Sequence, residues 1–198
     1  MEIQKLREAF LRSAVRVVAR DGLDKATTKA IANEARLNEA YIYKCFSGKD
    51  ELLAAALYEE DANYGVFLCD TIRELRTMGL AWRERAQLLF VRSWEFILQD
   101  PDDFIFYVRY YYSTCRGEAY EQHLACYRPM VEMVREQFRP GTYVEMLSHQ
   151  IFSTMLFFGA RVVNGEIEDS EETRAMVFEQ IYSFVAPNLR PEVLQAHA

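Results

Sequence analysis

Apolar residues recur along this chain at the spacing of an α-helix, and this pattern restricts the possible folds more than any other sequence feature. No stretch combines sustained alternation of apolar and polar residues with β-branched enrichment. The first helix is expected over about residues 2–21, and one of its faces carries Leu6, Phe10, Ala14, Val17 and Val18. Later helices are expected at about 81–99, 102–115, 118–138, 143–164 and 170–186. The sequence therefore predicts an all-α protein, with Pro187 and Pro191 ending its structured part.

The composition supports a folded domain of this kind. The chain has 198 residues, of which 51% are hydrophobic, and its 13 Phe and 12 Tyr exclude an intrinsically disordered protein. The most apolar run, residues 155–160, ends at Arg161 and is far shorter than the roughly 20 residues of a membrane span. Charged residues near the N-terminus do not fit a signal peptide. We therefore expect a cytoplasmic protein.

The charges divide the chain into two unlike parts. The net charge is −7, but residues 1–57 hold 10 Lys+Arg against 8 Asp+Glu, and every lysine of the chain lies there. Residues 58–198 hold 13 Arg against 22 Asp+Glu. Such asymmetry indicates that the N-terminal part meets a polyanion.

Residues 22–49 have the pattern of a helix-turn-helix. Gly22 ends the first helix, Thr28 opens and caps a short helix to about Ala35, and Asn38 caps another that runs to about Cys45. A long helix is expected at about residues 49–76 after the Ser47-Gly48 break. The spacing of a small core is shown by Ile31, Ala32, Ala35, Leu37, Ile42 and Phe46. The remaining positions are polar or aromatic and suit contacts with phosphates and base edges.

Here the sequence resembles the TetR family of transcriptional repressors. The matching residues are Gly22, Thr27-Thr28, Ile31-Ala32, Ala35, Asn38-Glu39-Ala40, Ile42-Tyr43, Phe46 and Lys49-Asp50-Glu51-Leu52-Leu53. The resemblance covers about residues 6–57, whereas the rest of the chain agrees in length and helical content. It implies a DNA-binding domain at residues 1–48 and a helical effector-binding and dimerisation domain at residues 49–198.

The resemblance also assigns DNA contacts position by position. Thr28 with neighbouring Lys29, Tyr43 and Lys49 correspond to phosphate contacts, and a helix N-terminus at Lys49 also favours phosphate. The groove-facing part of the recognition helix corresponds to Asn38, Glu39, Ala40, Tyr41 and Lys44. Glu39 has two readings, because it could accept a hydrogen bond from a cytosine amino group or simply favour the helix N-terminus.

Three positions depart from the family pattern. Arg36 stands where glycine is common, so either an extra cation lies near the DNA backbone or the turn is strained. Tyr41 replaces a small residue, and Cys45 replaces an aromatic residue or histidine. These departures affect the expected target sequence more than the DNA-binding role.

The second part of the chain is rich in aromatic residues between Trp94 and Tyr127. Aromatic stripes usually form core, but a cavity with a few polar groups is the usual form of a ligand site. We expect a pocket for a small apolar or aromatic effector, lined by some of Trp94, Tyr107, Tyr111, His123, Tyr127, Phe152 and Met155.

The last two expected helices carry more apolar residues than a monomer core requires. We expect a two-fold dimer through these helices, with an interface that includes Phe152, Leu156, Gly159, Val163, Phe178 and Tyr182. The alternative is ordinary packing within one chain.

Other functions find less support in the sequence. There is no Cys-x-x-Cys pair, and a metal site from Cys115, His123 and Cys126 would lack a tight ligand pair. No motif of an enzyme is present, and we expect no cofactor. The leading hypothesis is a dimeric, effector-responsive repressor on palindromic DNA, and the alternative is a ligand- or partner-binding helical dimer that no longer binds DNA.

Overall fold

The computed structural model describes residues 2–113 and 119–195, and within them it is helical apart from connecting turns and an isolated bridge between Phe138 and Leu189. The helices are α1 (Ile3–Asp21), α2 (Thr28–Glu34), the 3₁₀ helix η1 (Glu39–Lys44), α3 (Lys49–Arg76), α4 (Trp82–Leu98), α5 (Pro101–Tyr111), α6 (Ala119–Arg135), α7 (Val144–Val163), α8 (Glu171–Val185), the 3₁₀ helix η3 (Ala186–Asn188) and α9 (Pro191–Gln195). The prediction of an all-α protein is confirmed.

One detail of that prediction is wrong. Pro187 and Pro191 were expected to end the structured part, but Pro187 lies within η3 and Pro191 is the first residue of α9. Proline is tolerated at the first position of a helix because its missing N–H would have no partner inside the helix.

Two compact units make up the chain, one of Met1–Asn63 with Asp100–Leu124 and one of Tyr64–Gln99 with Ala125–Ala198. We call these unit 1 and unit 2. The division differs from the expected boundary after residue 48, since unit 1 includes the first part of α3, all of α5 and the beginning of α6.

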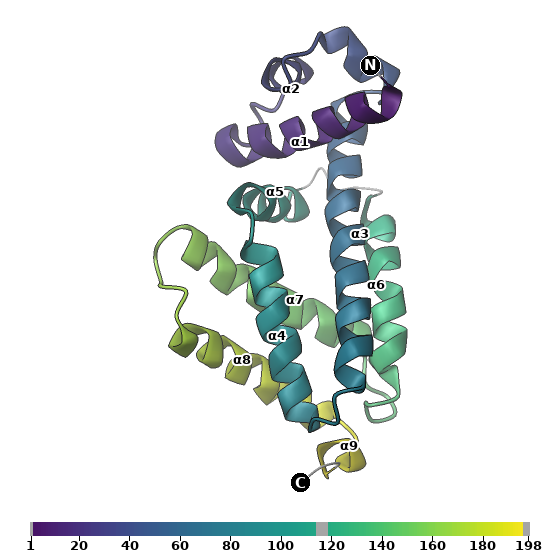
Figure 1. Cartoon of the computed structure of the whole chain (residues 1–198), viewed down its shortest axis with the longest axis vertical. Coiled ribbons are helices and arrows are strands. Elements are labelled where there is room, and N and C mark those ends of the chain that lie inside the picture. The colour runs from purple at the N-terminus through teal and green to yellow at the C-terminus, as the bar shows by residue number, and fades with distance from the viewer. Residues whose placement is uncertain (1, 114–118, 196–198) are drawn as a thin grey trace. The chain divides into compact units, whose positions relative to one another are not determined.

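Unit 1 is organised around α1, which packs against α2, η1 and α5 (Figure 1). Gly22 ends α1 with φ +88°, and its N–H donates to the Val18 carbonyl oxygen at 3.0 Å. At the start of α5, Asp100 accepts a hydrogen bond from the Asp102 N–H at 2.9 Å, and Pro101 follows at the first helical position. These end signals define the two helices whose packing supports the helix-turn-helix.

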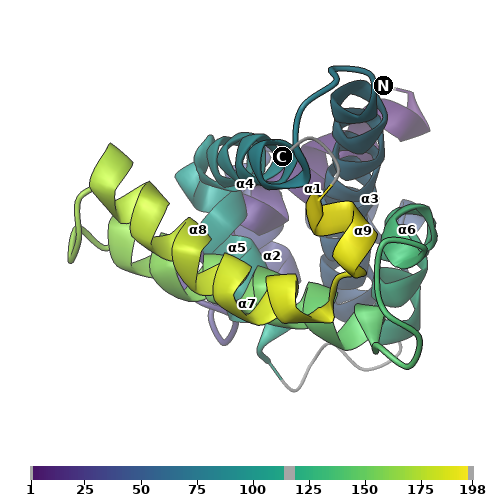
Figure 2. The same cartoon turned by 90° about the horizontal axis from the view of Figure 1, so that it is seen from below.

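Unit 2 contains a continuous apolar core between α4, α6, α7 and α8. Its buried members are Phe90, Trp94, Val131, Phe138, Val144, Met155, Val177, Phe178, Ile181, Val185 and Leu189. Helices α7 and α8 lie side by side, as both views show (Figures 1 and 2). The described helices include none that is both long and apolar enough to cross a membrane.

Candidate nucleic-acid interface

The helix-turn-helix consists of α2, a short turn and η1. Thr27 caps α2, because its hydroxyl oxygen accepts a hydrogen bond from the Ala30 N–H at 3.1 Å. The prediction that Thr28 is the cap is therefore wrong by one residue. Asn38 caps η1 as predicted, with its Oδ1 accepting from the Ala40 N–H at 2.9 Å.

The turn between these helices forces Arg36 into the left-handed region, with φ +55°. Among the described residues, Arg36 alone has a positive φ without being glycine. A side chain with a Cβ is strained in this conformation, which glycine adopts without cost. Of the two readings of Arg36 left open by the sequence, strain in the turn is thus confirmed.

The helix-turn-helix is held by a small apolar core. Ile31 and Ile42 are completely buried, Ala32 is 1% exposed and Phe46 is 3% exposed. Ala35 and Leu37 are half-buried at the turn. The guanidinium of Arg7, on α1, lies 4.6 Å from the centre of the Phe46 ring. This core fixes which residues of η1 are directed outward.

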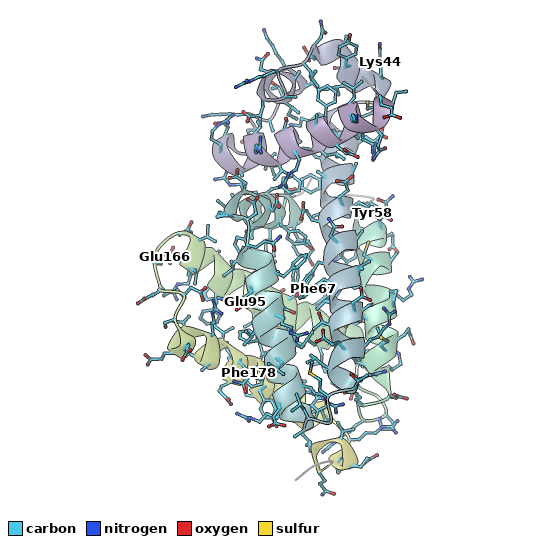
Figure 3. The ribbon with its side chains drawn as sticks, in the orientation of Figure 1. Lys44, Tyr58, Phe67, Glu95, Glu166 and Phe178 are labelled. Atoms are coloured by element: carbon cyan, nitrogen blue, oxygen red, sulfur yellow. The ribbon has the colours of Figure 1, made fainter. Side chains whose placement is uncertain are left out.

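The residues predicted to contact DNA lie at the surface of α2, η1 and the beginning of α3. Six of them are exposed, namely Lys29, Asn38, Ala40, Tyr41, Tyr43 and Lys44, and three are half-buried, namely Thr28, Glu39 and Lys49. Figure 3 shows Lys44 extending from this end of unit 1. The structure thus brings the predicted groove and phosphate contacts onto accessible positions.

Contacts within the interface constrain several of these side chains. The Lys44 ammonium lies 4.6 Å from the centre of the Tyr41 ring, a cation–π contact within η1. The Lys49 Nζ donates to the Leu23 carbonyl oxygen at 3.2 Å. The Thr28 hydroxyl donates to Glu39 Oε1 at 2.5 Å, which joins α2 to η1. Sequence spacing did not indicate this last contact, since the two residues are eleven positions apart.

The start of α3 is fixed by Glu51. Its carboxylate accepts a hydrogen bond from the Ser47 N–H at 2.6 Å, and this contact holds the pKa of Glu51 below its ordinary value. An ionised acid in the first turn of a helix also interacts favourably with the helix dipole. The exit from η1 into α3 is therefore well defined.

The predicted effector residues do not form one group. Tyr107, Tyr111 and His123 lie in unit 1, where they surround the buried Asp61 of α3. The Tyr107 hydroxyl donates to Asp61 Oδ1 at 2.8 Å, and His123 Nδ1 lies 3.0 Å from Asp61 Oδ2. The ring centres of Tyr111 and His123 are 5.1 Å apart. Asp61 was missed by sequence reasoning, because it follows Glu59 and Glu60, and a run of acids in a long helix looks solvent-exposed.

The other predicted effector residues lie in unit 2. Trp94 and Met155 belong to its core, and Trp94 Nε1 donates to Asp169 Oδ1 at 2.9 Å. Tyr127 and Phe152 instead contact Tyr64, with ring centres 6.1 and 5.7 Å from it. We name this second group the Tyr64 cluster, and its members are Tyr64, Phe67, Phe96, Tyr127 and Phe152.

The Tyr64 cluster draws its rings from α3, α4, α6 and α7. Phe67 and Phe96 are stacked with ring centres 4.5 Å apart, and Figure 3 shows Phe67 on the side of α3 that faces α4. Tyr64 is 7% exposed, whereas the other four rings are half-buried. Tyr64 and Phe67 were missed, although their i, i+3 spacing in the long helix places them on one face.

The predicted dimer residues of α7 and α8 divide by their exposure. Leu156 and Phe178 are each 3% exposed and Gly159 is also buried, so these three are already covered within unit 2. Their place in a dimer interface stays a prediction. Phe152, Val163 and Tyr182 are half-buried. The exposed apolar side chains of these helices are instead Met146, Phe157 and Met176.

Within the described residues, no group of three His, Cys, Asp or Glu side chains is arranged to hold a metal ion. Cys115, one of the ligands considered from the sequence, lies outside the described residues. Cys126 lies in unit 2, and His123 lies in unit 1.

Comparison with known proteins agrees with this geometry. Residues 10–56 match the family model described as bacterial regulatory proteins of the tetR family. The nicotine-responsive transcriptional repressor HdnoR of Paenarthrobacter nicotinovorans is 42% identical over 53 residues, which cover 27% of each chain. The DNA-binding transcriptional repressor TetR of Mycobacteroides abscessus is 36% identical over 85 residues, which cover 41% of this chain and 44% of the relative. The matches thus span less than half the length of either relative.

The fold of the whole chain is also shared with solved structures. A TetR family transcription regulator from Marinobacter aquaeolei VT8 has a TM-score of 0.70 and 19% identity, and the alignment covers 91% of this chain and 95% of that one. At this identity the likeness concerns the fold alone, and the family model matches only the N-terminal part of the chain. Residues 10–56 therefore match the model of the tetR family of bacterial regulatory proteins.

Proposed function

We propose that this protein is a transcriptional repressor that binds palindromic operator DNA as a dimer and is released by a small effector. The observation that carries the proposal is the exposed face of the helix-turn-helix, where Lys29, Tyr43 and Lys44 are accessible. The two lysines stand out because the chain as a whole has a net charge of −7. Cations and hydroxyl groups at these positions suit phosphate contacts. The two relatives named above bear the name of transcriptional repressors, which supports repression.

Selection of bound fragments from the source genome tests DNA binding directly. The purified full-length protein would be mixed with sheared genomic DNA, and the retained fragments sequenced. We expect a palindromic motif with half-sites about one helical turn apart or at a longer groove-compatible spacing. Retention of no fragment above background would favour the alternative of a helical dimer that does not bind DNA.

Dimerisation is proposed through α7 and α8. The exposed apolar side chains Phe157 and Met176 lie on these adjacent helices, 60% and 50% exposed in the single chain. A two-fold interface would cover such side chains against their copies. Light scattering at micromolar concentration should give twice the chain mass, and the variant Phe157→Glu should give the mass of one chain. A monomeric wild-type protein would contradict this part of the proposal.

The effector is proposed to be an apolar or aromatic compound that binds at the Tyr64 cluster. Four of its five rings are half-buried, so part of their surface is available for contact with a ligand. The name of the nicotine-responsive relative, which matches 27% of this chain, supports a small-molecule effector. A ligand acts on DNA affinity only through different affinities for DNA-competent and DNA-incompetent states.

A panel of aromatic compounds, screened by thermal shift and by release of bound DNA, tests the effector proposal. A compound that raises the melting temperature and releases DNA should lose both effects in Tyr127→Leu. It should retain them in Tyr143→Leu, which removes a tyrosine that is 81% exposed elsewhere in unit 2. Equal responses of the two variants would place the effector site outside the Tyr64 cluster.

A further inference from the structure

The contact between Thr28 and Glu39 gives these residues a joint role that neither has alone. Thr28 Oγ1 donates to Glu39 Oε1 at 2.5 Å, so the hydroxyl proton is directed to the carboxylate. Both side chains are half-buried, and their neighbours Lys29, Asn38 and Ala40 are exposed. A hydroxyl has one proton to donate, and a phosphate oxygen can only accept. Thr28 therefore cannot donate to a phosphate while it holds Glu39.

The second carboxylate oxygen of Glu39 remains available at the same surface. Among the described residues, Glu39 Oε2 accepts no hydrogen bond, and no Lys or Arg forms an ion pair with this carboxylate. Thr28 thus limits the rotation of a carboxylate that keeps one accepting oxygen. An acid without a cation on a DNA-binding face repels phosphates, so a hydrogen-bond donor on the DNA is the partner that would stabilise it there.

Base edges in the major groove offer few such contacts. A carboxylate can only accept hydrogen bonds, and the donors in this groove are the amino groups of cytosine and adenine. In adenine the amino group lies next to the N7 acceptor, which repels a carboxylate. Guanine and thymine present acceptors. An oriented carboxylate therefore selects cytosine.

On this basis we propose that Glu39 reads a cytosine in each half-site, and that Thr28 is a positioning residue that orients the Glu39 carboxylate. The inference depends on the proposed DNA-binding function and adds to it one base preference and its structural cause. It also changes the expected role of Thr28, from a contact that strengthens binding to every sequence to one that acts on a single base.

The experiment is selection of bound sequences from a randomised duplex pool by the full-length protein and four variants. The wild-type protein should select cytosine at one position of each half-site. Glu39→Gln should select adenine there, because glutamine can pair with both the amino group and N7 of adenine. The selected base should be preferred over each of the other bases by about tenfold.

Thr28 variants separate a positioning role from a phosphate contact. Thr28→Val keeps the shape of the side chain and removes the hydroxyl, so the cytosine preference should fall more than the affinity for a random duplex. Thr28→Ser keeps the hydroxyl and should keep the preference. Lys29→Ala is the matched control, since loss of a neighbouring cation should weaken binding to all duplexes without changing the preferred base.

The outcomes distinguish this inference from the proposed function. If the wild-type protein selects a motif but Glu39→Gln selects the same one, the base-reading role of Glu39 is wrong. If Thr28→Val weakens binding to every duplex equally and keeps the base preference, Thr28 is a phosphate contact and its positioning role is wrong. If the folded wild-type protein selects no sequence at all, the DNA-binding function fails, and the inference fails with it.

Discussion

Arg109 of α5 donates a hydrogen bond from Nη1 to the carbonyl oxygen of Val18 at 2.7 Å, in the last turn of α1. The same nitrogen lies 3.0 Å from the Ala19 carbonyl oxygen. The Val18 carbonyl oxygen also accepts from the Gly22 N–H, and both carbonyl groups lie at the end of the helix that carries partial negative charge, so a guanidinium is well suited to them. At the other end of α5, Arg12 of α1 lies 2.6 Å from Asp103. Two arginines thus join the same pair of helices.

Replacement of Arg109 should show how much this contact contributes to unit 1. We expect Arg109→Ala to lower the free energy of unfolding by about 1–2 kcal/mol, because hydrogen bonds from a charged group are lost at the α1 terminus. Urea unfolding followed by circular dichroism measures the change. Arg109→Lys keeps the charge without the planar guanidinium and should recover part of the loss. An unchanged midpoint for Arg109→Ala would contradict a stabilising role.

The turn of the helix-turn-helix offers a stabilising substitution. Arg36 has φ +55°, which costs a residue with a Cβ roughly 1–2 kcal/mol. Glycine removes this strain but adds about 0.5–1 kcal/mol of unfolded-state entropy. We therefore expect Arg36→Gly to raise the free energy of unfolding by about 0.5–1 kcal/mol. Arg36→Ala keeps the strain and should leave stability nearly unchanged, and equal effects of both variants would rule out backbone strain as the cause.

Gly65 permits a close approach of α3 and α6 within unit 2. A Cβ at this position would lie 2.6 Å from the carbonyl oxygen of Cys126, and a backbone atom cannot move aside cheaply. The strain should exceed the roughly 1 kcal/mol that alanine gains over glycine inside a helix. We expect Gly65→Ala to lower the free energy of unfolding by about 1 kcal/mol in the same assay. Val66→Ala, at the exposed neighbouring position, should stay within about 0.5 kcal/mol of wild type.

Glu60 should make the stability of the protein depend on pH. Burial, followed by repulsion from Asp103, raises the pKa of Glu60 to about 7. Between its ordinary pKa of 4.5 and about 7, the folded state keeps a proton that the unfolded state has released. Stability should therefore fall as the pH rises through this range, and above it the ionised carboxylate should remain unfavourable.

The variant Glu60→Gln removes this titration. Relative to wild type, its melting temperature should rise more at pH 8 than at pH 5. The difference should be about 2–4 °C, corresponding to on the order of 1 kcal/mol after allowance for solvent screening. Glu121→Gln, which removes an exposed acid of unit 1, should show the same offset at both pH values. A Glu60→Gln offset that does not depend on pH would show that burial leaves this carboxyl group unperturbed.

Local sequence signals predicted most of the helices. The long helix was expected at about 49–76 and is Lys49–Arg76, because Ser47-Gly48 interrupts the preceding helix. The residue that caps α2 was harder to predict. Thr27 and Thr28 carry the same hydroxyl group, so the residue type does not show which of the two is the cap. The short helix at Pro191 was missed because proline was read as an end signal, although it also suits the first position of a helix.

The candidate sites show where local signals stop being informative. The face of η1 could be predicted because one short segment supplies both its buried and its exposed residues. Contacts between helices depend on how the helices pack, so the sequence did not show that Asp61 meets Tyr107 and His123. For the same reason, seven residues expected to line one pocket are divided between the core of unit 2, the Tyr64 cluster and the surroundings of Asp61.

The central claim is that the outer face of α2 and η1 binds DNA, and the salt dependence of binding tests it most directly. Fluorescence anisotropy would measure the affinity of the wild-type protein and of Lys44→Ala for a selected genomic fragment. The salt concentration would be varied from about 50 to about 300 mM. Arg73→Ala, which removes an exposed cation of unit 2, is the control.

We expect the logarithm of the wild-type affinity to fall steeply and linearly with the logarithm of the salt concentration. Lys44→Ala should bind more weakly with a shallower slope, because a cation at the DNA surface is lost, whereas Arg73→Ala should match wild type. Equal affinities and slopes for the wild-type protein and Lys44→Ala would contradict the assignment of this face as the DNA-binding surface.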